Sequence, residues 1–374
     1  MIPELSIEAE FYLNPEWIEQ ALKHSGDISS DTKISSVDAS TLSGGYMADT
    51  YLIKLNYARN EDGAPGSLVA KFPASNAGSL ATGRETGAYL LEINFYKHLA
   101  QKLNMRVPKC YFAEIDPDGA KFALLLEDLN PAEMLDEKFV DVDKAKVSMQ
   151  QLALLHAATW NDVSLRKLGW MKDYSNPEYF EVITQLVSQG WVNLRKTAKG
   201  LLEKNSPIVA KLSDDFVSVG EEYIKKLPAI HKNIGKRMCL THCDYRPANL
   251  LYKKSGESVA LDWQTYHFGP PGFDTYYFIN HTYHDLDTHP YKDILLKTYY
   301  DALTEAGVTD YSWDECLSDY EFGVFYRTLM NLLVAEGVGG ADGIPELLQV
   351  KMFRSTPIDW RFMTDNNLLK NLDA

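Results

Sequence analysis

The residues best suited to chemistry lie between positions 240 and 278, in the segment LTHCDYRPANLLYKKSGESVALDWQTYHFGPPGFDTYYF. Pro247 disfavours a helix just before it, so Asp244 is expected on a loop. Two short apolar runs flank a Ser-Gly turn and predict a hairpin that places Asn249 beside Asp262. Amide and carboxylate oxygens suit Mg²⁺, which is usually held by few protein ligands together with substrate phosphates. Asp244 then remains to accept a proton from a hydroxyl group.

The spacing of these residues matches a known catalytic pattern. In the kinase catalytic loop H-R-D-x-x-x-x-N, an Asp precedes an Asn by five positions, and a later Asp binds metal. Here the order is His242, Asp244, Asn249 and Asp262. Cys243 replaces the arginine, and Trp-Gln replaces Phe-Gly after Asp262, which points away from protein kinases. A lone His-x-Asp with a later Asn also arises by chance in loops, so the hairpin and Asp262 are what favour a phosphoryl-transfer site.

The segment resembles the aminoglycoside phosphotransferase and choline kinase superfamily, whose motif H-G-D-x-x-x-x-N precedes a D-x-Q or D-x-E. The stretches THCDYRPANLLY, ALDWQTYHFGPPGFD and LALLHAATW most resemble its ecdysteroid kinase-like branch and the bacterial relatives of that branch. This resemblance implies an α+β fold of two lobes, with a small antiparallel β-sheet N-lobe and a larger, mainly helical C-lobe. It also implies ATP, Mg²⁺ and an acceptor hydroxyl on a sterol, sugar, antibiotic or amino alcohol. Asp274 resembles a structural carboxylate that supports the catalytic loop and caps the next helix.

Composition limits the class of protein. A chain of 374 residues with 45% hydrophobic side chains can bury the cores of two lobes, here 1–128 and 129–374. The formal charge of -15 argues against a nucleic-acid partner and favours a cationic or neutral substrate. Four cysteines without metal-ligand spacing indicate a reducing compartment. Without a signal pattern or an apolar run of about 20 residues, we expect a cytoplasmic protein with no membrane partner.

The first 60 residues predict a helix followed by two strands. Asn14, Pro15 and Gly26 have the positions of N-cap, first residue and C-terminal stop of an accessory helix. Strands are expected over 34–42 and 48–57. Between them lie Ser43, Gly44 and Gly45, small residues that let a hairpin backbone approach nucleotide phosphates. An ordinary hairpin turn remains the alternative.

Lys71 is the one charge in the apolar strand 67–72, where a kinase fold carries its phosphate-pairing lysine. Such a lysine needs a carboxylate partner if it is buried, and is otherwise a solvated edge residue. The partner is expected on a helix over 84–101. Glu92, at the edge of the apolar face, is favoured over Glu85.

The strand 120–127 ends in an acidic, Asn-Pro stretch where two lobes would join. By position, Glu127 and Leu129 are candidates for binding the nucleotide at such a hinge, although a plain strand end has the same pattern. From residue 141 onward the pattern becomes helical, with helices expected around residue 152 and over 178–189, 208–226, 291–306, 313–334 and 344–353.

Several other polar and aromatic residues have two possible interpretations. His156 is expected to be buried and hydrogen-bonded. A cluster of histidines and aspartates over 281–289 contains possible metal ligands, but its irregular spacing favours a solvated loop. Cys243 is either a buried small side chain or an oxidation-sensitive thiol beside Asp244. An aromatic-rich pocket or a core is expected from the following residues: Tyr245, Trp263, Tyr266, His267, Tyr276, Tyr277 and Tyr283.

Two classes of function follow. In the first, the protein is a small-molecule kinase in which Lys71 orients phosphates, Asn249 and Asp262 hold Mg²⁺, and Asp244 activates the acceptor hydroxyl. In the second, the same fold binds a nucleotide without turnover, as a sensor or scaffold. The complete residue set favours the enzyme. Peptide substrates are disfavoured because no A-P-E segment follows Asp262.

Overall fold

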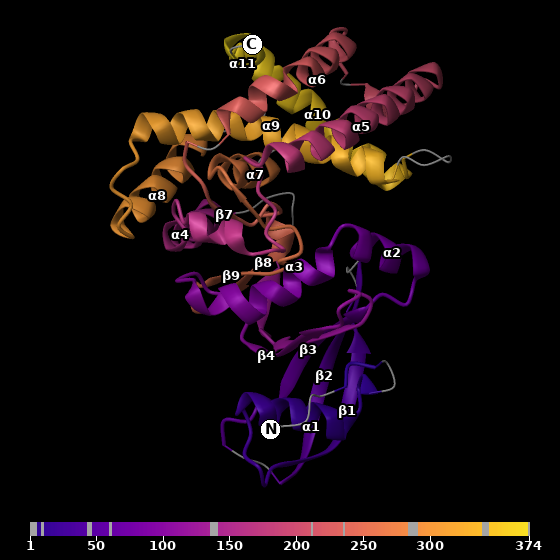
Figure 1. Cartoon of the computed structure of the whole chain (residues 1–374), viewed down its shortest axis with the longest axis vertical. Helices are drawn as coiled ribbons and strands as arrows, with labels where there is room; N and C mark the ends of the chain where they lie inside the picture. Colours follow the sequence, from indigo (N-terminus) through magenta and orange to yellow (C-terminus); the bar gives the residue numbers. More distant parts are fainter. Residues whose placement is uncertain are drawn as a thin grey trace. The chain divides into compact units, whose positions relative to one another are not determined.

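The computed structural model describes residues 6–8, 11–42, 47–59, 62–134, 141–210, 212–234, 236–282, 291–338 and 344–372. The chain forms two compact units, one of residues 1–134 and 249–265 and the other of 135–248 and 266–374. The first contains an antiparallel sheet and the second is mainly helical, so the expected α+β class is confirmed (Figure 1). The division differs from the expected 1–128 and 129–374, because the hairpin after Asn249 packs with the first unit.

The first unit is built on a five-stranded antiparallel sheet with the order β1-β2-β3-β5-β4. Its strands are β1 (Lys33–Thr41), β2 (Ala48–Arg59), β3 (Ser67–Pro73), β4 (Cys110–Ile115) and β5 (Phe122–Glu127). A smaller sheet joins β6 (Ala132–Met134), β8 (Leu250–Lys253) and β9 (Ser258–Ala260) in the order β6-β8-β9. Strands β8 and β9 follow β6 by more than 100 residues in the sequence, so this small sheet brings a distant segment into the first unit.

Helix α1 (Pro15–Ser25) has the ends expected from its sequence. The Asn14 side chain accepts hydrogen bonds from the N–H groups of residues 16 and 17, and Gly26 adopts a left-handed φ of 77°. The helix buries Trp17, Ile18 and Leu22 in the core of the sheet. Burying this apolar face is what holds the accessory helix on the sheet.

The expected helix over 84–101 is interrupted. The structure has α2 (Ala77–Glu85), then α3 (Ala88–Asn94), continued by a π-helical turn over Phe95–Leu99 and a short 3₁₀ turn. Gly87 separates α2 from α3 with a left-handed φ of 70°, a conformation that glycine adopts at little cost. Glu85 and Glu92 therefore lie on different helices.

The second unit consists mainly of helices. They are α4 (Val142–Ala158), α5 (Pro177–Glu203), α6 (Phe216–Asn233), α7 (Gly272–Thr282), α8 (Lys292–Glu305), α9 (Trp313–Val338), α10 (Glu346–Asp365) and α11 (Leu368–Asn371). Two short strands, β7 (Cys239–Thr241) and β10 (His267–Gly269), pair beside them. The expected helix over 208–226 is wrong in its first part, where a 3₁₀ turn at Pro207–Val209 precedes α6.

Helices α7 and α9 approach each other closely at two glycines. A Cβ atom on Gly272 would lie 1.7 Å from the carbonyl oxygen of Asp319, and one on Gly323 would lie 2.1 Å from the carbonyl oxygen of Gly272. Both distances are shorter than any real contact, so larger residues would force the helices apart. This contact fixes α7, which carries Asp274 and Tyr277, against α9.

No helix within the described part of the chain combines the length and the apolar character that a membrane span requires. All four cysteines are free thiols.

Candidate active site

In the first unit, Lys71 and Glu92 form a buried ion pair. Lys71 lies on β3 and Glu92 on α3, and the Lys71 Nζ to Glu92 Oε1 distance is 2.6 Å. Gln264 donates from Nε2 to the other Glu92 oxygen at 3.1 Å, a contact that the sequence did not predict. Asp262 Oδ1 lies 3.4 Å from the same ammonium. The carboxylate of Glu92, rather than that of Glu85, therefore holds the lysine.

The two members of this pair shift each other's pKa. Burial disfavours the charged ammonium, but the carboxylates of Glu92 and Asp262 outweigh it and hold the pKa of Lys71 above its usual value. Burial raises the pKa of Glu92, and Lys71 opposes that rise. Lys71 therefore stays protonated near neutral pH and presents a fixed positive charge.

The hairpin of β8 and β9 has the predicted form. Leu250 pairs with Ala260, and the N–H of Leu261 donates to the carbonyl oxygen of Asn249 at 2.9 Å. This bond brings Asn249 and Asp262 to the same end of the hairpin. Asp262 adopts a left-handed φ of 64°, which is uncommon outside glycine and is tolerated better by Asp than by most residues.

Trp263, next to Asp262, belongs to the core of this unit. Its ring stacks on Phe95 with centroids 3.8 Å apart and an interplanar angle of 7°. Its Nε1 donates to the carbonyl oxygen of Ala260 at 3.3 Å. Phe95 begins the π-helical turn after Glu92, so this stack ties Asp262 to the helix that carries the partner of Lys71.

Asn249 and Asp262 supply oxygen donors of the kind that Mg²⁺ prefers. The side chain of Asp262 is 39% exposed, so a carboxylate oxygen can reach a solvated ion. No group of three or more His, Cys, Asp or Glu side chains within the described ranges forms a metal cluster. The donor set fits a cation held by few protein ligands and completed by nucleotide phosphates, rather than an all-protein metal site.

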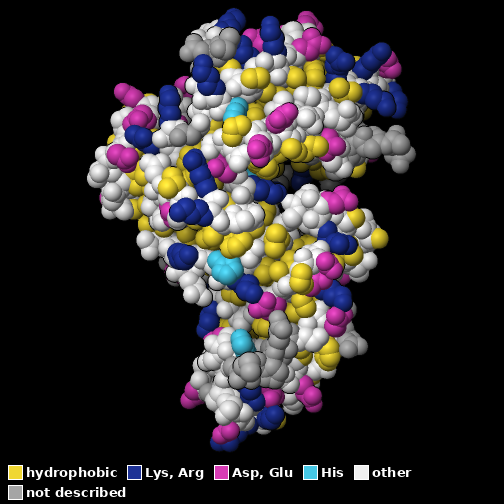
Figure 2. Space-filling view, viewed as in Figure 1, with side chains coloured by type: hydrophobic (Ala, Val, Ile, Leu, Met, Phe, Trp, Pro, Cys, Tyr) yellow, Lys and Arg dark blue, Asp and Glu magenta, His cyan; other side chains and the backbone are white. Residues whose placement is uncertain are grey.

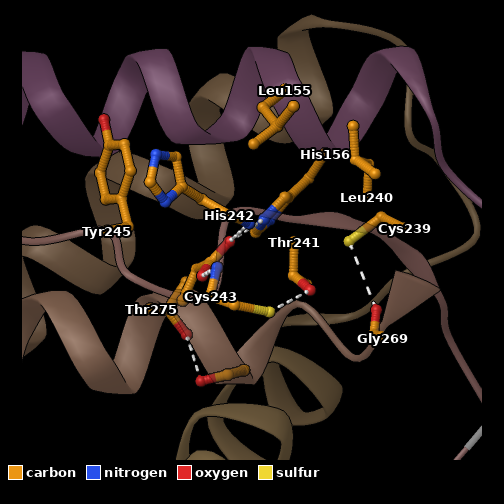
Figure 3. Close-up of polar contacts among 12 residues, drawn as sticks. Leu155, His156, Cys239, Leu240, Thr241, His242, Cys243, Tyr245, Gly269 and Thr275 are labelled. Carbon is orange, nitrogen blue, oxygen red and sulfur yellow. Dashed lines mark hydrogen bonds and ion pairs between the residues drawn. The ribbon is translucent and has the colours of Figure 1, made fainter. Parts of the chain in front are cut away.

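In the second unit, a buried carboxylate shapes the loop before Asp244 (Figure 3). Asp274 is fully buried and accepts hydrogen bonds from the N–H groups of His242 at 2.6 Å and Cys243 at 2.8 Å. His156 Nε2 lies 3.2 Å from the same carboxylate. Its Nδ1 lies 2.7 Å from the hydroxyl of Tyr299. His156 is thus the buried, hydrogen-bonded residue expected from its position, and Asp274 supports the loop as expected.

Cys243 occupies a position that favours glycine. Its φ is 67°, in the left-handed region where a side chain is strained. Tyr326 donates its hydroxyl to the Cys243 carbonyl oxygen at 3.1 Å. Both the N–H and the carbonyl group of Cys243 are therefore held by side chains. The thiol is 1% exposed, and burial raises its pKa far above the usual value. These features favour an unreactive buried thiol over an oxidation-sensitive one.

Asp244 is positioned by two side chains. Arg246 donates from Nε to Asp244 Oδ1 at 3.0 Å, and the hydroxyl of Tyr277 donates to the same oxygen at 3.0 Å. The Asp244 side chain is 24% exposed. The role of Arg246 could not be predicted from the sequence, since a short-range pair on a loop has no periodicity.

Asp244 also lines a cavity of about 300 Å³ within the second unit. Helices α7, α9 and α10 supply the rest of its wall. The lining residues are Asp244, Arg246, Tyr277, Asn280, His281, Arg327, Asn331, Val334, Leu348, Lys351, Met352, Arg354 and Ser355. A carboxylate that opens into a cavity of this size has room for a small molecule beside it.

The remaining candidates are Glu127, Leu129 and the stretch 43–45. Glu127 accepts two hydrogen bonds of 2.7 Å from Arg106, and its N–H donates to the Lys109 carbonyl oxygen at 2.8 Å. Burial raises the pKa of Glu127, but the hydrogen bonds and charge of Arg106 outweigh this effect and hold the pKa below its usual value. The carboxylate therefore stays charged. Leu129 is buried. Ser43, Gly44 and Gly45 lie outside the described residues.

Most of the aromatic candidates are core residues. Four of them are buried completely: Tyr245, Trp263, Tyr266 and Tyr276. Tyr277 lines the cavity, whereas His267 is buried, with its Nε2 3.1 Å from the Tyr179 hydroxyl. Of the histidine and aspartate cluster over 281–289, His281 lines the cavity and residues 283–289 lie outside the described part of the chain.

The fold is that of kinase-like phosphotransferases. A candidate aminoglycoside phosphotransferase from Ralstonia eutropha is 15% identical, with a TM-score of 0.55 over 95% of this chain and 98% of its own. The GDP complex of aminoglycoside 2'-phosphotransferase-IIIa is also 15% identical, with a TM-score of 0.52 over 95% of this chain and 99% of its own. At this identity the likeness establishes the fold alone. No curated protein sequence is significantly similar to the chain.

The model of the ecdysteroid kinase-like family matches residues 43–308, which is more than half of the chain. The chain belongs to the ecdysteroid kinase-like family. The resemblance drawn from the motifs around Asp244 and Asp262 is therefore confirmed.

Proposed function

We propose that this protein transfers a phosphoryl group from ATP to a hydroxyl group of a small molecule, with Mg²⁺ as the metal ion. The observation that carries the proposal is the buried Lys71–Glu92 pair with Asp262 beside its ammonium. A buried ion pair adds little net stability compared with well-packed apolar residues. A fold that keeps one beside a strained, partly exposed carboxylate is better explained by a need for charge than by a need for stability.

Each residue then has a defined role. Lys71 binds phosphate oxygens of the nucleotide, and Glu92 and Gln264 fix the direction of its side chain. Asn249 and Asp262 hold Mg²⁺, which would neutralise charge on the phosphates. Much of the catalysis in such a site consists of positioning and charge neutralisation. Glu127 and Leu129 are proposed to lie near the nucleotide base, and Ser43, Gly44 and Gly45 near its phosphates, by their place in the chain alone.

In the second unit, Asp244 takes the proton of the acceptor hydroxyl. Arg246 and Tyr277 both donate to Oδ1, so they fix the rotamer of the carboxylate. This positioned carboxylate is the proposed base. The acceptor occupies the cavity that Asp244 lines. We place the nucleotide with the first unit and the acceptor with the second.

The alternative is a protein that binds nucleotide without turnover. The orientation of Asp244 by two donors favours the enzyme, because a binding-only protein has no use for a positioned base. A non-catalytic relative commonly lacks one of the charged residues, and here all of them are present.

The test is a search for phosphorylated products. The full chain is incubated with ATP, Mg²⁺ and a panel of hydroxylated metabolites and antibiotics, and mass spectrometry records the gain of one phosphoryl group. We expect at least one acceptor to gain the group only when Mg²⁺ is present. The binding-only alternative is supported if calorimetry detects ATP binding while no member of a chemically broad panel is phosphorylated.

A further inference from the structure

The cavity beside Asp244 has an unusual charge for this chain. The protein carries a formal charge of -15, yet among the described residues that line the cavity four are basic and Asp244 is the one carboxylate. The four are Arg246, Arg327, Lys351 and Arg354. On the face shown in Figure 2, by contrast, basic and acidic side chains are interspersed. Basic side chains therefore outnumber acidic ones among the described residues that line this cavity.

Arg246 and Arg327 each have a carboxylate partner. Arg246 donates to Asp244, and Arg327 donates from Nε to Asp359 at 2.8 Å. Arg327 and Asp359 are buried, and Tyr276 also donates to Asp359, at 2.9 Å. Arg327 thus has a structural role in holding α9 to α10. This role accounts for one of the four positive charges at the cavity.

Lys351 and Arg354 lie in the N-terminal half of α10. Both are exposed side chains that also line the cavity, so they stand at its solvent side. Within the described ranges, Lys351 makes no ion pair with a carboxylate. A lysine placed this way keeps its charge available to a bound molecule.

The rest of the wall indicates the chemical character of a bound molecule. On α10, Leu348, Lys351, Met352 and Ser355 recur at spacings of three and four and present one mixed face to the cavity. Val334 on α9 adds another apolar group. An apolar wall with a few charged groups is typical of small-molecule sites, where the charges set orientation and specificity.

We propose that the acceptor is an amphipathic hydroxylated molecule that carries an anionic group, such as a carboxylate, held by Lys351 and Arg354. This inference rests on the proposed function, since it assigns the substrate class of the same cavity. It reverses the expectation of a cationic or neutral substrate, which followed from net charge. Net charge describes the whole surface, whereas recognition depends on the groups that line the site.

The first experiment measures binding without nucleotide, so it is independent of turnover. The probes are anilinonaphthalene sulfonate, which is an amphipathic anion, and phenylnaphthylamine, which has the same aromatic skeleton without the sulfonate. We expect the sulfonate to bind the full chain about 10-fold more tightly than the neutral probe, because a charge-assisted contact favours the anion. Equal affinities would overturn the proposal.

Variants then locate the contact. The double variant Lys351→Met with Arg354→Met should lose the preference for the sulfonate, whereas Lys351→Arg should keep it. The control is Arg361→Met, which removes an exposed cation on the same helix outside the cavity. All positions are exposed, so little effect on folding is expected. A preference that survives in the double variant, or that disappears in Arg361→Met, would refute the assignment.

Turnover provides the second arm. Acceptors in the phosphorylation screen are grouped as acids, neutral esters of those acids, and amines of matched size. We expect the acids to be phosphorylated, with the KM rising about 10-fold and kcat little changed in the double variant. Phosphorylation of amines or esters alone would sink this inference and leave the kinase proposal intact. A sulfonate preference that depends on Lys351, without any turnover, would support the anion site while the kinase proposal fails.

Discussion

The two units each bury a carboxylate near their candidate site, but they use it differently. In the first unit, Glu92 is held by a cation and an amide side chain, and it fixes the position of a charge, the Lys71 ammonium. In the second unit, Asp274 is held by two backbone N–H groups and His156, and it fixes the shape of a loop. The same chemical group therefore positions a charge in one region and a backbone in the other.

The difference follows from what each region has to present. Phosphates and metal ions respond to charge, and charge acts strongly where water is excluded. A proton acceptor must instead lie within hydrogen-bond reach of its donor, so the backbone that carries Asp244 has to be fixed. Fixing this backbone costs conformational strain at Cys243, whose positive φ is maintained by hydrogen bonds to Asp274 and Tyr326.

The largest effect is expected for Asp244→Asn. This change keeps the shape of the side chain and removes the charge of the proposed base, so turnover should fall by about 10²- to 10⁴-fold. ATP affinity, measured by calorimetry, should remain, because Asp244 lies outside the proposed nucleotide-binding set. An unchanged rate with an identified acceptor would remove Asp244 from the mechanism.

Asp262→Ala should act on binding. It removes the proposed carboxylate ligand of Mg²⁺, and Asn249 with water gives the ion too little charge compensation. ATP should then bind equally well with and without Mg²⁺ in calorimetric titrations. Since the Asp262 side chain is partly exposed, the unfolding temperature of the variant without nucleotide should change little. Unchanged affinity for MgATP would contradict the metal assignment.

Lys71→Met separates charge from shape in the first unit. It leaves Glu92 buried without its cation, which should lower the free energy of unfolding by about 3–5 kcal/mol. The double variant with Glu92→Gln should recover much of that loss, in a denaturant-based mutant cycle.

The same variant has a defined pH dependence. The pKa of Glu92 is already raised by burial, and loss of the lysine raises it further. A carboxyl group whose folded pKa exceeds its unfolded pKa stabilises the fold at low pH, and this contribution is lost as pH rises through the folded value. Lys71→Met should therefore be less destabilised at low pH than at neutral pH. A loss that is constant with pH would mean that Glu92 is not the stranded group.

Asp274→Asn tests the backbone role in the second unit. An amide is a weaker acceptor than a carboxylate and has one acceptor oxygen, so one of two buried N–H groups loses its partner at a cost of about 1–3 kcal/mol. Amide hydrogen exchange should accelerate at His242 and Cys243, and kcat should fall while ATP affinity is kept. Unchanged exchange at both amides would show that Asp274 does not hold the loop.

Cys243→Gly should have the smallest effect. Glycine relieves the strain of the positive φ but removes a buried thiol, so stability should change by no more than about 1 kcal/mol and activity should remain. Cys243→Val, with a β-branched side chain at the same φ, is the opposite probe and should be clearly destabilised. Activity of the unmodified protein should survive mild peroxide treatment. Loss of activity that Cys243→Gly prevents would restore the oxidation hypothesis.

The features that could be predicted from the sequence depend on local interactions. The caps of α1, the hairpin of β8 and β9, and the pairing of Lys71 with Glu92 follow from turn chemistry, apolar patterning and the need of a buried charge for a partner. The break at Gly87 was missed because an isolated glycine within a helical pattern is often tolerated. Arg106 was missed because no motif or apolar pattern in the sequence marks it as the partner of Glu127.

By itself, the sequence determined the family and the order of the charged residues along the chain, because motifs of fixed spacing encode local geometry. Only the tertiary structure decided that His156 is the partner of Asp274, and that Lys351 and Arg354 line the same cavity as Asp244. Those residues lie some 30 to 110 positions from Asp244 along the chain. The packing of α7, α9 and α10 brings them together, and burial there changes how strongly each charge acts.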